Sequence, residues 1–321
     1  MPSSTSSSEA AAARRRQYDE RLISMERSPR DWKFLTAIGA TALALFGLWN
    51  VAIPHLPRHL PTLNQSEDNR HIILDFARDK TSSLTLAGTS LIYRLAPSLF
   101  NEEIANIALP GQSPVSSANI ALQKQPRTLV IEVNILDRSR DLAIEQFAQR
   151  AISPPLGLEA LSFANTPARA TVSSLYRLDA KAAKRAVASA NAARNLLGQS
   201  PEPLRYTETV SSAAKAFDAR PVTGAISQSA QELRAIADQV EAKGGRAYYL
   251  YMPMHPLLAA TDYEERSRRA MTAADPKFRS RLLSIDWNDE IRWEPDGGHL
   301  DARSALIVAQ QLEEAIARKS Q

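Results

Sequence analysis

The chain has 321 residues, of which 44% are hydrophobic and 23% are charged, with a formal net charge of +4 and no cysteine. This composition can supply a folded core and argues against wholesale disorder. The lack of cysteine excludes disulfides, thiolate nucleophiles and zinc–thiolate sites. The small net charge, concentrated near the N-terminus, gives no broad basic face for nucleic acid.

The N-terminal region combines a basic leader with one uncharged apolar segment. Residues 1–33 are rich in Ser and Ala at their start and basic from Arg14 to Lys33, so we expect a disordered cytoplasmic tail. Residues 34–53 read FLTAIGATALALFGLWNVAI, and about 20 such residues span the hydrocarbon core of a bilayer. The positive-inside rule then predicts a cytoplasmic N-terminus and an exported C-terminal region.

Two interpretations of this apolar segment are open, an uncleaved single-pass anchor and a cleaved signal peptide. Trp32 and Trp49 lie near its ends, where interfacial aromatic residues belong. The long leader and the lack of a following small-x-small cleavage site favour the anchor. Three prolines between residues 54 and 70 then indicate a stiff linker, so we expect the exported domain to cover residues 71–321.

Short apolar runs alternate with helical patterns in this domain, which predicts an α/β fold with a five-stranded parallel sheet. The expected strands are Leu84–Ala87, Ile104–Leu109, Thr128–Val133, Ala247–Met252 and Leu282–Ile285.

The helical patterns also have predicted bounds. An apolar stripe from Ile226 to Val240 predicts a helix ending at Gly244-Gly245, and Asp301 is the expected N-cap of a last helix. Residues 140 to about 215 are rich in Ala, Arg and Ser and read as a helical insertion. A helix is expected there from Asp179 to Leu197.

Three expected strands end in residues that a serine hydrolase uses. Ser90 follows the first strand, Gly111 the second and Asn134 the third, and ligands bind at this edge of open α/β sheets. Each residue also has a structural interpretation. Ser90 suits a helix N-cap, and Gly111 and Asn134 suit ordinary turns.

Asp296 and His299 lie three residues apart in Trp293-Glu294-Pro295-Asp296-Gly297-Gly298-His299-Leu300, just before the last helix. A serine esterase needs an imidazole held by a carboxylate, and the glycines let one short loop present both groups. The structural alternative is an Asp-Gly turn ahead of a helix.

The order Ser, Gly, Asn and Asp-x-x-His along the chain resembles the SGNH (GDSL-like) hydrolase family. The resemblance covers about residues 84–312, apart from the insertion. It implies a three-layer sandwich with Ser90 as nucleophile, His299 as general base oriented by Asp296, and Gly111 and Asn134 in the oxyanion hole. Neither a cofactor nor a metal is implied.

The chain departs from the family pattern at two blocks. Thr89 stands where the family usually has Asp, and Glu132-Val133-Asn134 replaces Gly-x-Asn-Asp. An α/β-hydrolase is less compatible, because Ile92 breaks the G-x-S-x-G elbow and that fold does not place acid and base in one turn.

The segment Met252-Pro253-Met254-His255-Pro256 resembles one in membrane-anchored SGNH-like proteins of bacterial exopolysaccharide acetylation. His255 is a candidate substrate contact or a loop histidine with a structural hydrogen bond. Arg94 is a candidate substrate contact or part of a solvated helix face.

The resemblance implies a serine O-acetyl esterase or acetyltransferase, held by one helix in the bacterial cytoplasmic membrane with its domain in the periplasm. Its expected substrate is a polysaccharide or acylated glycan, and its expected partner is a membrane acyltransferase or a polysaccharide synthesis or export complex. The alternative function is a non-catalytic binding or scaffold subunit of such a complex.

Overall fold

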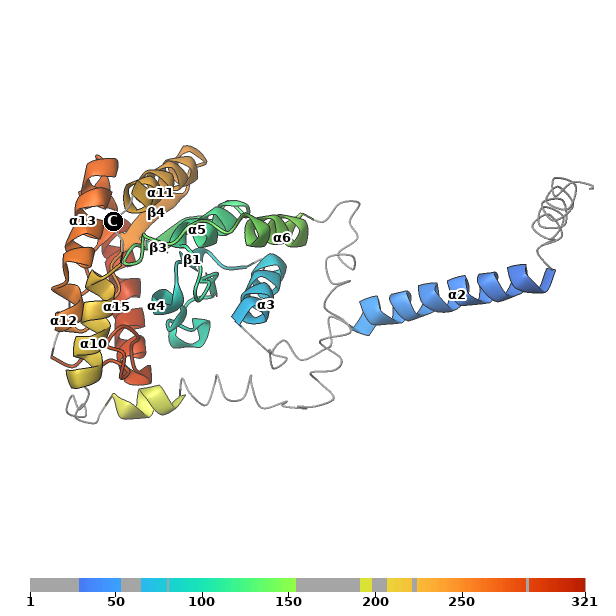
Figure 1. Ribbon diagram of the computed structural model, residues 1–321, viewed down its shortest axis with the longest axis horizontal. Helices are drawn as coiled ribbons and strands as arrows, with labels where there is room; N and C mark the ends of the chain where they lie inside the picture. Colours follow the sequence, from blue (N-terminus) through green and yellow to red (C-terminus); the bar gives the residue numbers. More distant parts are fainter. Residues whose placement is uncertain are drawn as a thin grey trace, which may run out of the picture. The chain divides into compact units, whose positions relative to one another are not determined.

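The computed structural model describes residues 29–52, 65–79, 81–153, 191–197, 207–220, 224–286 and 289–320 (Figure 1). The chain divides into two compact units, Met1–Pro57 and Arg58–Gln321.

The first unit contributes helix α2 (Pro29–Ala52), whose 24 residues cover all but the last residue of the apolar segment. Its large apolar side chains are exposed, among them Phe34, Leu43 and Leu48. Within the described ranges, no helix is long and apolar enough to cross a membrane. That residues 34–53 form an anchor stays a prediction.

The second unit contains a five-stranded, fully parallel sheet with the strand order β2-β1-β3-β4-β5. The strands are β1 (Leu84–Ala87), β2 (Ile104–Asn106), β3 (Thr128–Glu132), β4 (Arg246–Leu250) and β5 (Leu282–Leu283). The predicted α/β class and parallel sheet are therefore confirmed. Most strands end earlier than predicted, because their last apolar residues pack in the loops beyond the sheet.

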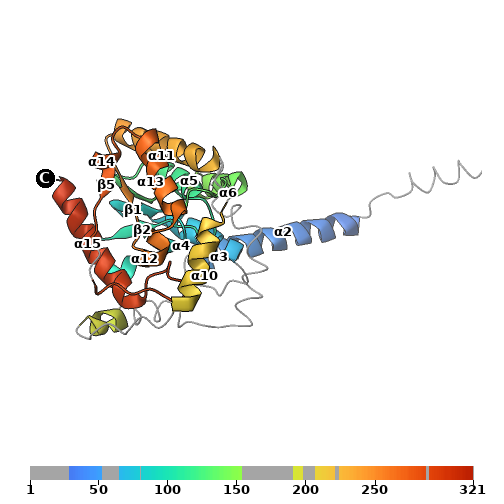
Figure 2. The same ribbon diagram turned by 60° about the vertical axis from the view of Figure 1, so that its left-hand side comes forward.

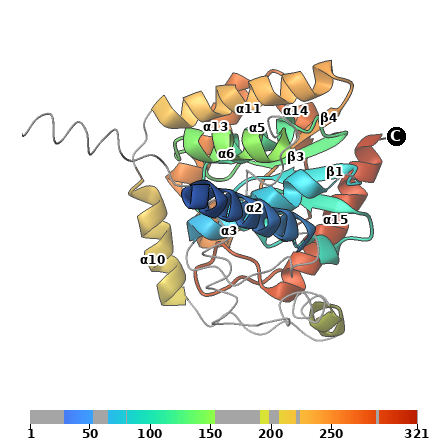
Figure 3. The same ribbon diagram turned by 90° about the vertical axis from the view of Figure 1, so that its right-hand side faces the viewer.

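Buried side chains on both faces of the sheet divide the core in two. On β3, Val130 packs in one cluster, while Leu129 and Ile131 pack in the other. Helix α15 (Ala302–Ser320) covers the face on which Val130 lies. Helices α5 (Pro114–Leu122) and α11 (Gly224–Ala242) cover the opposite face (Figure 3). Successive side chains of a strand point to opposite faces of the sheet, and both faces are buried here. These strands therefore have continuous apolar runs in the sequence.

Helix α3 (Gln65–Arg78) shows that the folded unit begins earlier than predicted. The side chain of Asn69 is fully buried, and its Nδ2 donates a hydrogen bond to the Pro110 carbonyl at 3.0 Å. Residues 65–70 therefore belong to the fold rather than to a linker ending at residue 70. Polar residues at the start of α3 concealed its helical period in the sequence.

The predicted insertion at 140–215 contains helix α6 (Leu142–Ile152) and most of helix α10 (Thr207–Asp218). Helix α6 packs against α3 and α5 through buried Ile144 and Ala148. Helix α10 packs against α12 (Pro256–Ala259), as Figure 2 shows. Of the helix predicted over 179–197, only residues 191–197 lie in the described part, where they are mostly helical.

The remaining elements are short, except for one 13-residue helix that forms part of the connection between β4 and β5. They are α4 (Ser90–Tyr93), the 3₁₀ turn η2 (Pro97–Leu99), α13 (Asp262–Ala274) and α14 (Phe278–Arg281). The start of α15 is as predicted, because Asp301 Oδ1 accepts a hydrogen bond from the Ser304 N–H at 2.7 Å.

Candidate active site

Ser90 lies at the carboxyl edge of the sheet, at the first position of helix α4. Gly88 has φ +155°, and a Cβ there would come within 2.6 Å of the Glu132 Cβ, so only glycine fits this turn. Thr89, not Ser90, is the N-cap, since its hydroxyl accepts a hydrogen bond from the Leu91 N–H. The hydroxyl of Ser90 is therefore not used for capping. The alternative interpretation of Ser90 as the N-cap is wrong.

A buried carboxylate joins the loop that carries Ser90 to the loop that carries Asn134. Glu132 is fully buried, and its Oε2 accepts hydrogen bonds from the Thr89 N–H at 2.8 Å and the Thr89 hydroxyl at 2.7 Å. Its Oε1 accepts one from the Asn134 N–H at 2.8 Å. Burial raises the pKa of Glu132, and these hydrogen bonds act in the opposite direction.

Asn134 is fully buried beside the end of β4. Its Oδ1 accepts a hydrogen bond from the Met252 N–H at 2.7 Å, and its Nδ2 donates one to the Met252 carbonyl at 3.1 Å. The side chain thus continues the pairing of the two strands. Among the described residues, the second amide hydrogen of Nδ2 has no hydrogen-bond acceptor.

Gly111 lies in the loop after β2 with φ +78°, a backbone conformation that favours glycine. A Cβ at this position would come within 2.6 Å of the Gln65 Nε2 at the start of α3. Among the described residues, no hydrogen bond uses the Gly111 N–H. The group is therefore available as a donor.

The segment from Trp293 to Leu300 forms a closed turn. Its ends pair as an antiparallel bridge, and the Glu294 N–H donates to the His299 carbonyl at 2.7 Å. Gly297 has φ +71° and packs its backbone closely against Val210 of α10, where a Cβ would approach to 3.0 Å. A side chain at residue 297 would strain this turn.

Asp296 and His299 form the predicted pair within this turn. The Asp296 Oδ2 is hydrogen-bonded to His299 Nδ1, while its Oδ1 accepts from the N–H groups of Gly298 and His299, both at 3.0 Å. Partial burial raises the pKa of Asp296, but these hydrogen bonds outweigh it and lower the pKa to about 2. The carboxylate is therefore ionised at neutral pH. An ionised carboxylate at Nδ1 favours the tautomer that carries its proton on Nδ1 and its lone pair on Nε2.

An ion pair and a close approach link this turn to the segment that begins at Ser90. Arg94 Nη2 forms an ion pair with Glu294 Oε2 at 2.7 Å. A Cβ on Gly298 would lie 3.6 Å from Leu91 Cδ2. The structure thus brings the Ser90 helix and the Asp296–His299 turn together. Across the described residues, no hydrogen bond joins Ser90 to His299.

His255 lies beside the turn and caps helix α12. Its Nδ1 accepts a hydrogen bond from the Leu257 N–H at 3.2 Å, and its ring packs edge-on against Trp293 at 5.3 Å between centroids. The backbone N–H of His255 donates to the Gly297 carbonyl at 2.8 Å. Burial lowers the pKa of His255. These contacts match the structural role weighed for this histidine.

Helix α10 packs beside the histidine turn, a position that the sequence did not predict. Phe217 packs edge-on against Tyr263 of α13 with ring centroids 5.2 Å apart, and Arg220 pairs with Asp137 at 3.2 Å. Asp137 follows β3 in the loop after Asn134. Helix α10 therefore touches the histidine turn through Val210, and Arg220, just after the helix, reaches the loop that carries Asn134. No local sequence signal marks these contacts.

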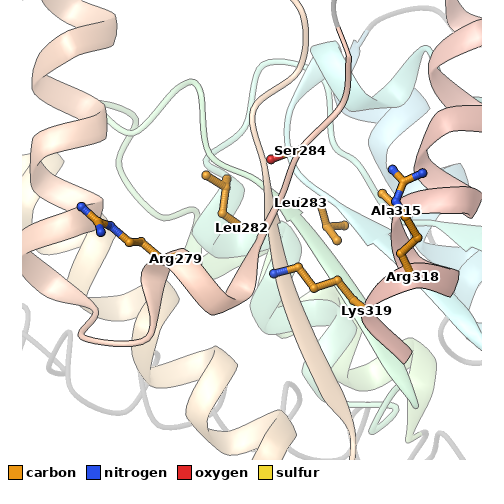
Figure 4. A pocket seen from close by; sticks show the side chains of 7 residues that line it. All are labelled: Arg279, Leu282, Leu283, Ser284, Ala315, Arg318 and Lys319. Carbon is orange, nitrogen blue, oxygen red and sulfur yellow. The ribbon is translucent and has the colours of Figure 1, made fainter. Parts of the chain in front are cut away.

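A separate cavity of about 380 Å³ lies against β5 and α15 (Figure 4). It is lined by Arg279, Leu282, Leu283, Ser284, Ala315, Arg318 and Lys319. Figure 4 shows the guanidinium groups of Arg279 and Arg318 pointing away from each other, so they do not converge on one anion. None of the predicted site residues lines this cavity.

Over the described ranges, no cluster of three or more His, Asp or Glu side chains could hold a metal ion. Comparison of the chain with protein-family models, with curated proteins and with solved structures gives no match. The coarse class that the structure defines is an α/β protein with a parallel five-stranded sheet.

Proposed function

We propose that this protein is an SGNH-type serine O-acyl esterase or acyltransferase that acts on a polysaccharide. The observation that carries the proposal is the hydrogen bond between Asp296 and His299 Nδ1, in a turn packed against the helix that starts with Ser90. In this proposal His299 is the oriented base for Ser90, a serine that does not cap helix α4. The N–H of Gly111, which bonds no other described residue, supplies one donor for an oxyanion.

The proposed reaction has two halves. His299 Nε2 takes the proton from the Ser90 hydroxyl as its oxygen bonds to the acyl carbonyl carbon. Gly111, Asn134 and the Ser90 N–H stabilise the oxyanion of the tetrahedral intermediate. The carbon–oxygen bond to the alcohol then breaks, the alcohol takes the proton from Nε2, and an acyl-Ser90 remains. Water or a sugar hydroxyl then gives its proton to Nε2 as its oxygen bonds to the acyl carbon. The bond between this carbon and the Ser90 oxygen breaks, and Ser90 takes the proton back from Nε2.

The apolar segment supports a location outside the cytoplasm. It lacks charges over residues 34–53, follows a basic leader, and adopts the helix α2. We expect alkaline phosphatase fused after Asn64, ahead of α3, to be active, and a fusion after Arg30 to be inactive. An inactive fusion at Asn64 contradicts the proposed topology.

Fluorophosphonate labelling of the purified full-length protein tests the chemistry, because the reagent reacts much faster with activated serines than with ordinary ones. We expect labelling of the wild type, no labelling of Ser90→Ala, and strongly reduced labelling of His299→Ala. Ser284→Ala is the matched control, since Ser284 is exposed in the cavity beside β5. It should label like the wild type.

The rival function is a non-catalytic binding or scaffold subunit of a polysaccharide complex. A folded wild-type protein that resists labelling and cleaves no acetyl ester would favour that rival. The acetyl content of the exopolysaccharide in a deletion strain separates transfer from hydrolysis. A loss of acetyl groups indicates transfer, and a gain indicates hydrolysis.

A further inference from the structure

Arg138 is a partly buried cation that lies between the two oxyanion-hole loops. It comes four residues after Asn134, and its Nη1 donates a hydrogen bond to the carbonyl of Gln112 at 3.2 Å. Gln112 directly follows Gly111. The guanidinium thus connects the loop after β2 to the loop after β3, at the edge of the sheet where Ser90 lies.

In the described part of the chain, Arg138 forms no ion pair, and its bond to Gln112 is its one hydrogen bond. The nearby carboxylates are occupied. Asp137 accepts from Arg220 at 3.2 Å and from the Tyr263 hydroxyl at 2.7 Å, and Glu132 accepts from Thr89 and Asn134. The described residues therefore provide no carboxylate that pairs directly with this charge.

The surroundings of Arg138 disfavour the protonated form of its guanidinium group. Burial lowers its pKa, as does the positive charge of Arg220, although Glu132 and Asp137 act in the opposite direction. Arginine nevertheless stays protonated in proteins and presents a planar fork of donors that fits a carboxylate. Removing such a cation from water without a partner costs free energy, which a bound anion offsets.

We propose that Arg138 binds a carboxylate of the substrate beside the oxyanion hole. This inference rests on the proposed function and names the substrate class of the same site as a carboxylate-bearing acyl ester. One carboxylate matches the site, because a dianion would add a second negative charge close to Glu132 and Asp137. The carboxylate comes either from the glycan, on the alcohol side of the ester, or from the acyl group.

Paired model esters test the proposal on the full-length protein. On the alcohol side, 4-acetoxybenzoate is compared with its neutral methyl ester. On the acyl side, mono-4-nitrophenyl succinate is compared with 4-nitrophenyl butanoate. In Arg138→Gln, we expect kcat/KM to fall roughly tenfold for one of the two anionic esters, because a charge-assisted bond is lost. That ester is the one whose carboxylate lies on the side of the ester bond that Arg138 contacts. Neutral esters should stay within about twofold of the wild type.

Arg140→Gln is the matched control, because Arg140 is exposed and already pairs with Glu145 and Glu232. It should leave the preference for anionic esters unchanged. An equal loss for neutral and anionic esters in Arg138→Gln overturns the proposal, since Arg138 would then only hold the Gln112 loop or balance Glu132. Unchanged rates for every ester overturn it as well.

Binding of two uncleavable amides, 4-acetamidobenzoate and N-phenylsuccinamate, separates this inference from the proposed function. Calorimetry should show tight binding of one of them to the wild type and at least fivefold weaker binding to Arg138→Gln. This result supports the carboxylate site even if no ester is cleaved. Equal binding of both amides to the two proteins contradicts the carboxylate site even if esters are cleaved.

Discussion

Glu132 accepts two hydrogen bonds from Thr89, the residue that precedes the candidate nucleophile, at 2.8 Å from its N–H and 2.7 Å from its hydroxyl. Both residues are fully buried. In the proposed assignment, Thr89 stands where the resembled family usually has Asp. The carboxylate of Glu132 therefore reaches the serine loop from the end of β3.

We expect Glu132→Gln to lower kcat by roughly 10- to 100-fold with little change in KM, because small displacements of reacting groups are costly. The amide of Gln places donors against the N–H of Thr89 or Asn134, where the carboxylate only accepts. Steady-state kinetics on an acetyl ester checks the result.

Two controls separate positioning from simple loss of a buried charge. Glu264 is as buried as Glu132, but it forms no hydrogen bond to the serine loop or to Asn134. The Glu264→Gln variant should therefore keep the wild-type kcat. Thr89→Ser keeps the hydroxyl that bonds Glu132, whereas Thr89→Val removes it. The serine variant should recover most of the activity that the valine variant loses. Equal rates in the two would count against positioning through Glu132.

Asp296→Asn should lower kcat on the order of 10² to 10⁴-fold at neutral pH, because an amide no longer holds the useful tautomer of His299. Glu294→Gln, which breaks the ion pair with Arg94, should cost far less. Near-wild-type rates for Asp296→Asn would refute its role in orienting the base.

The same carboxylate predicts a pH dependence of stability. The pKa of Asp296 is lowered from 3.8 to about 2 in the folded protein, so its stabilising contribution is present above 3.8 and is lost as pH falls toward 2. The difference in melting temperature between wild type and Asp296→Asn should therefore narrow over this range. A difference that widens on acidification contradicts the assignment.

His255 offers a test of capping against substrate binding. His255→Asn keeps a side-chain acceptor at the N-cap, whereas His255→Ala lowers the free energy of unfolding by about 1 kcal/mol. We expect Asn to preserve both melting temperature and KM. A raised KM in the stable Asn variant would show instead that the imidazole contacts substrate.

Arg281 provides a stability prediction away from the site. Its side chain is 3% exposed and pairs with Asp275 at 2.6 Å and Glu241 at 2.7 Å. Arg281→Met leaves the buried charge of Asp275 uncompensated and should lower the free energy of unfolding by about 3–5 kcal/mol. Urea unfolding measures this loss, while kcat of the folded fraction should not change. The exposed Arg234→Gln should cost under about 1 kcal/mol.

The strands and their parallel arrangement were predictable from the sequence, because short apolar runs between helical patterns reflect burial on both sheet faces. The loop positions of Ser90, Gly111 and Asn134 followed from the strand ends. The helix start at Asp301 followed from local capping chemistry. These features depend on neighbours close in the chain.

Only the tertiary structure decided how these positions are used. It made Thr89 the cap, joined Glu132 to two loops, and placed Val210 of α10 against the histidine turn. It also left Arg138 without a carboxylate partner among the described residues. Such relationships depend on residues far apart in the chain that meet when helices pack on the sheet, and no local period or spacing encodes them.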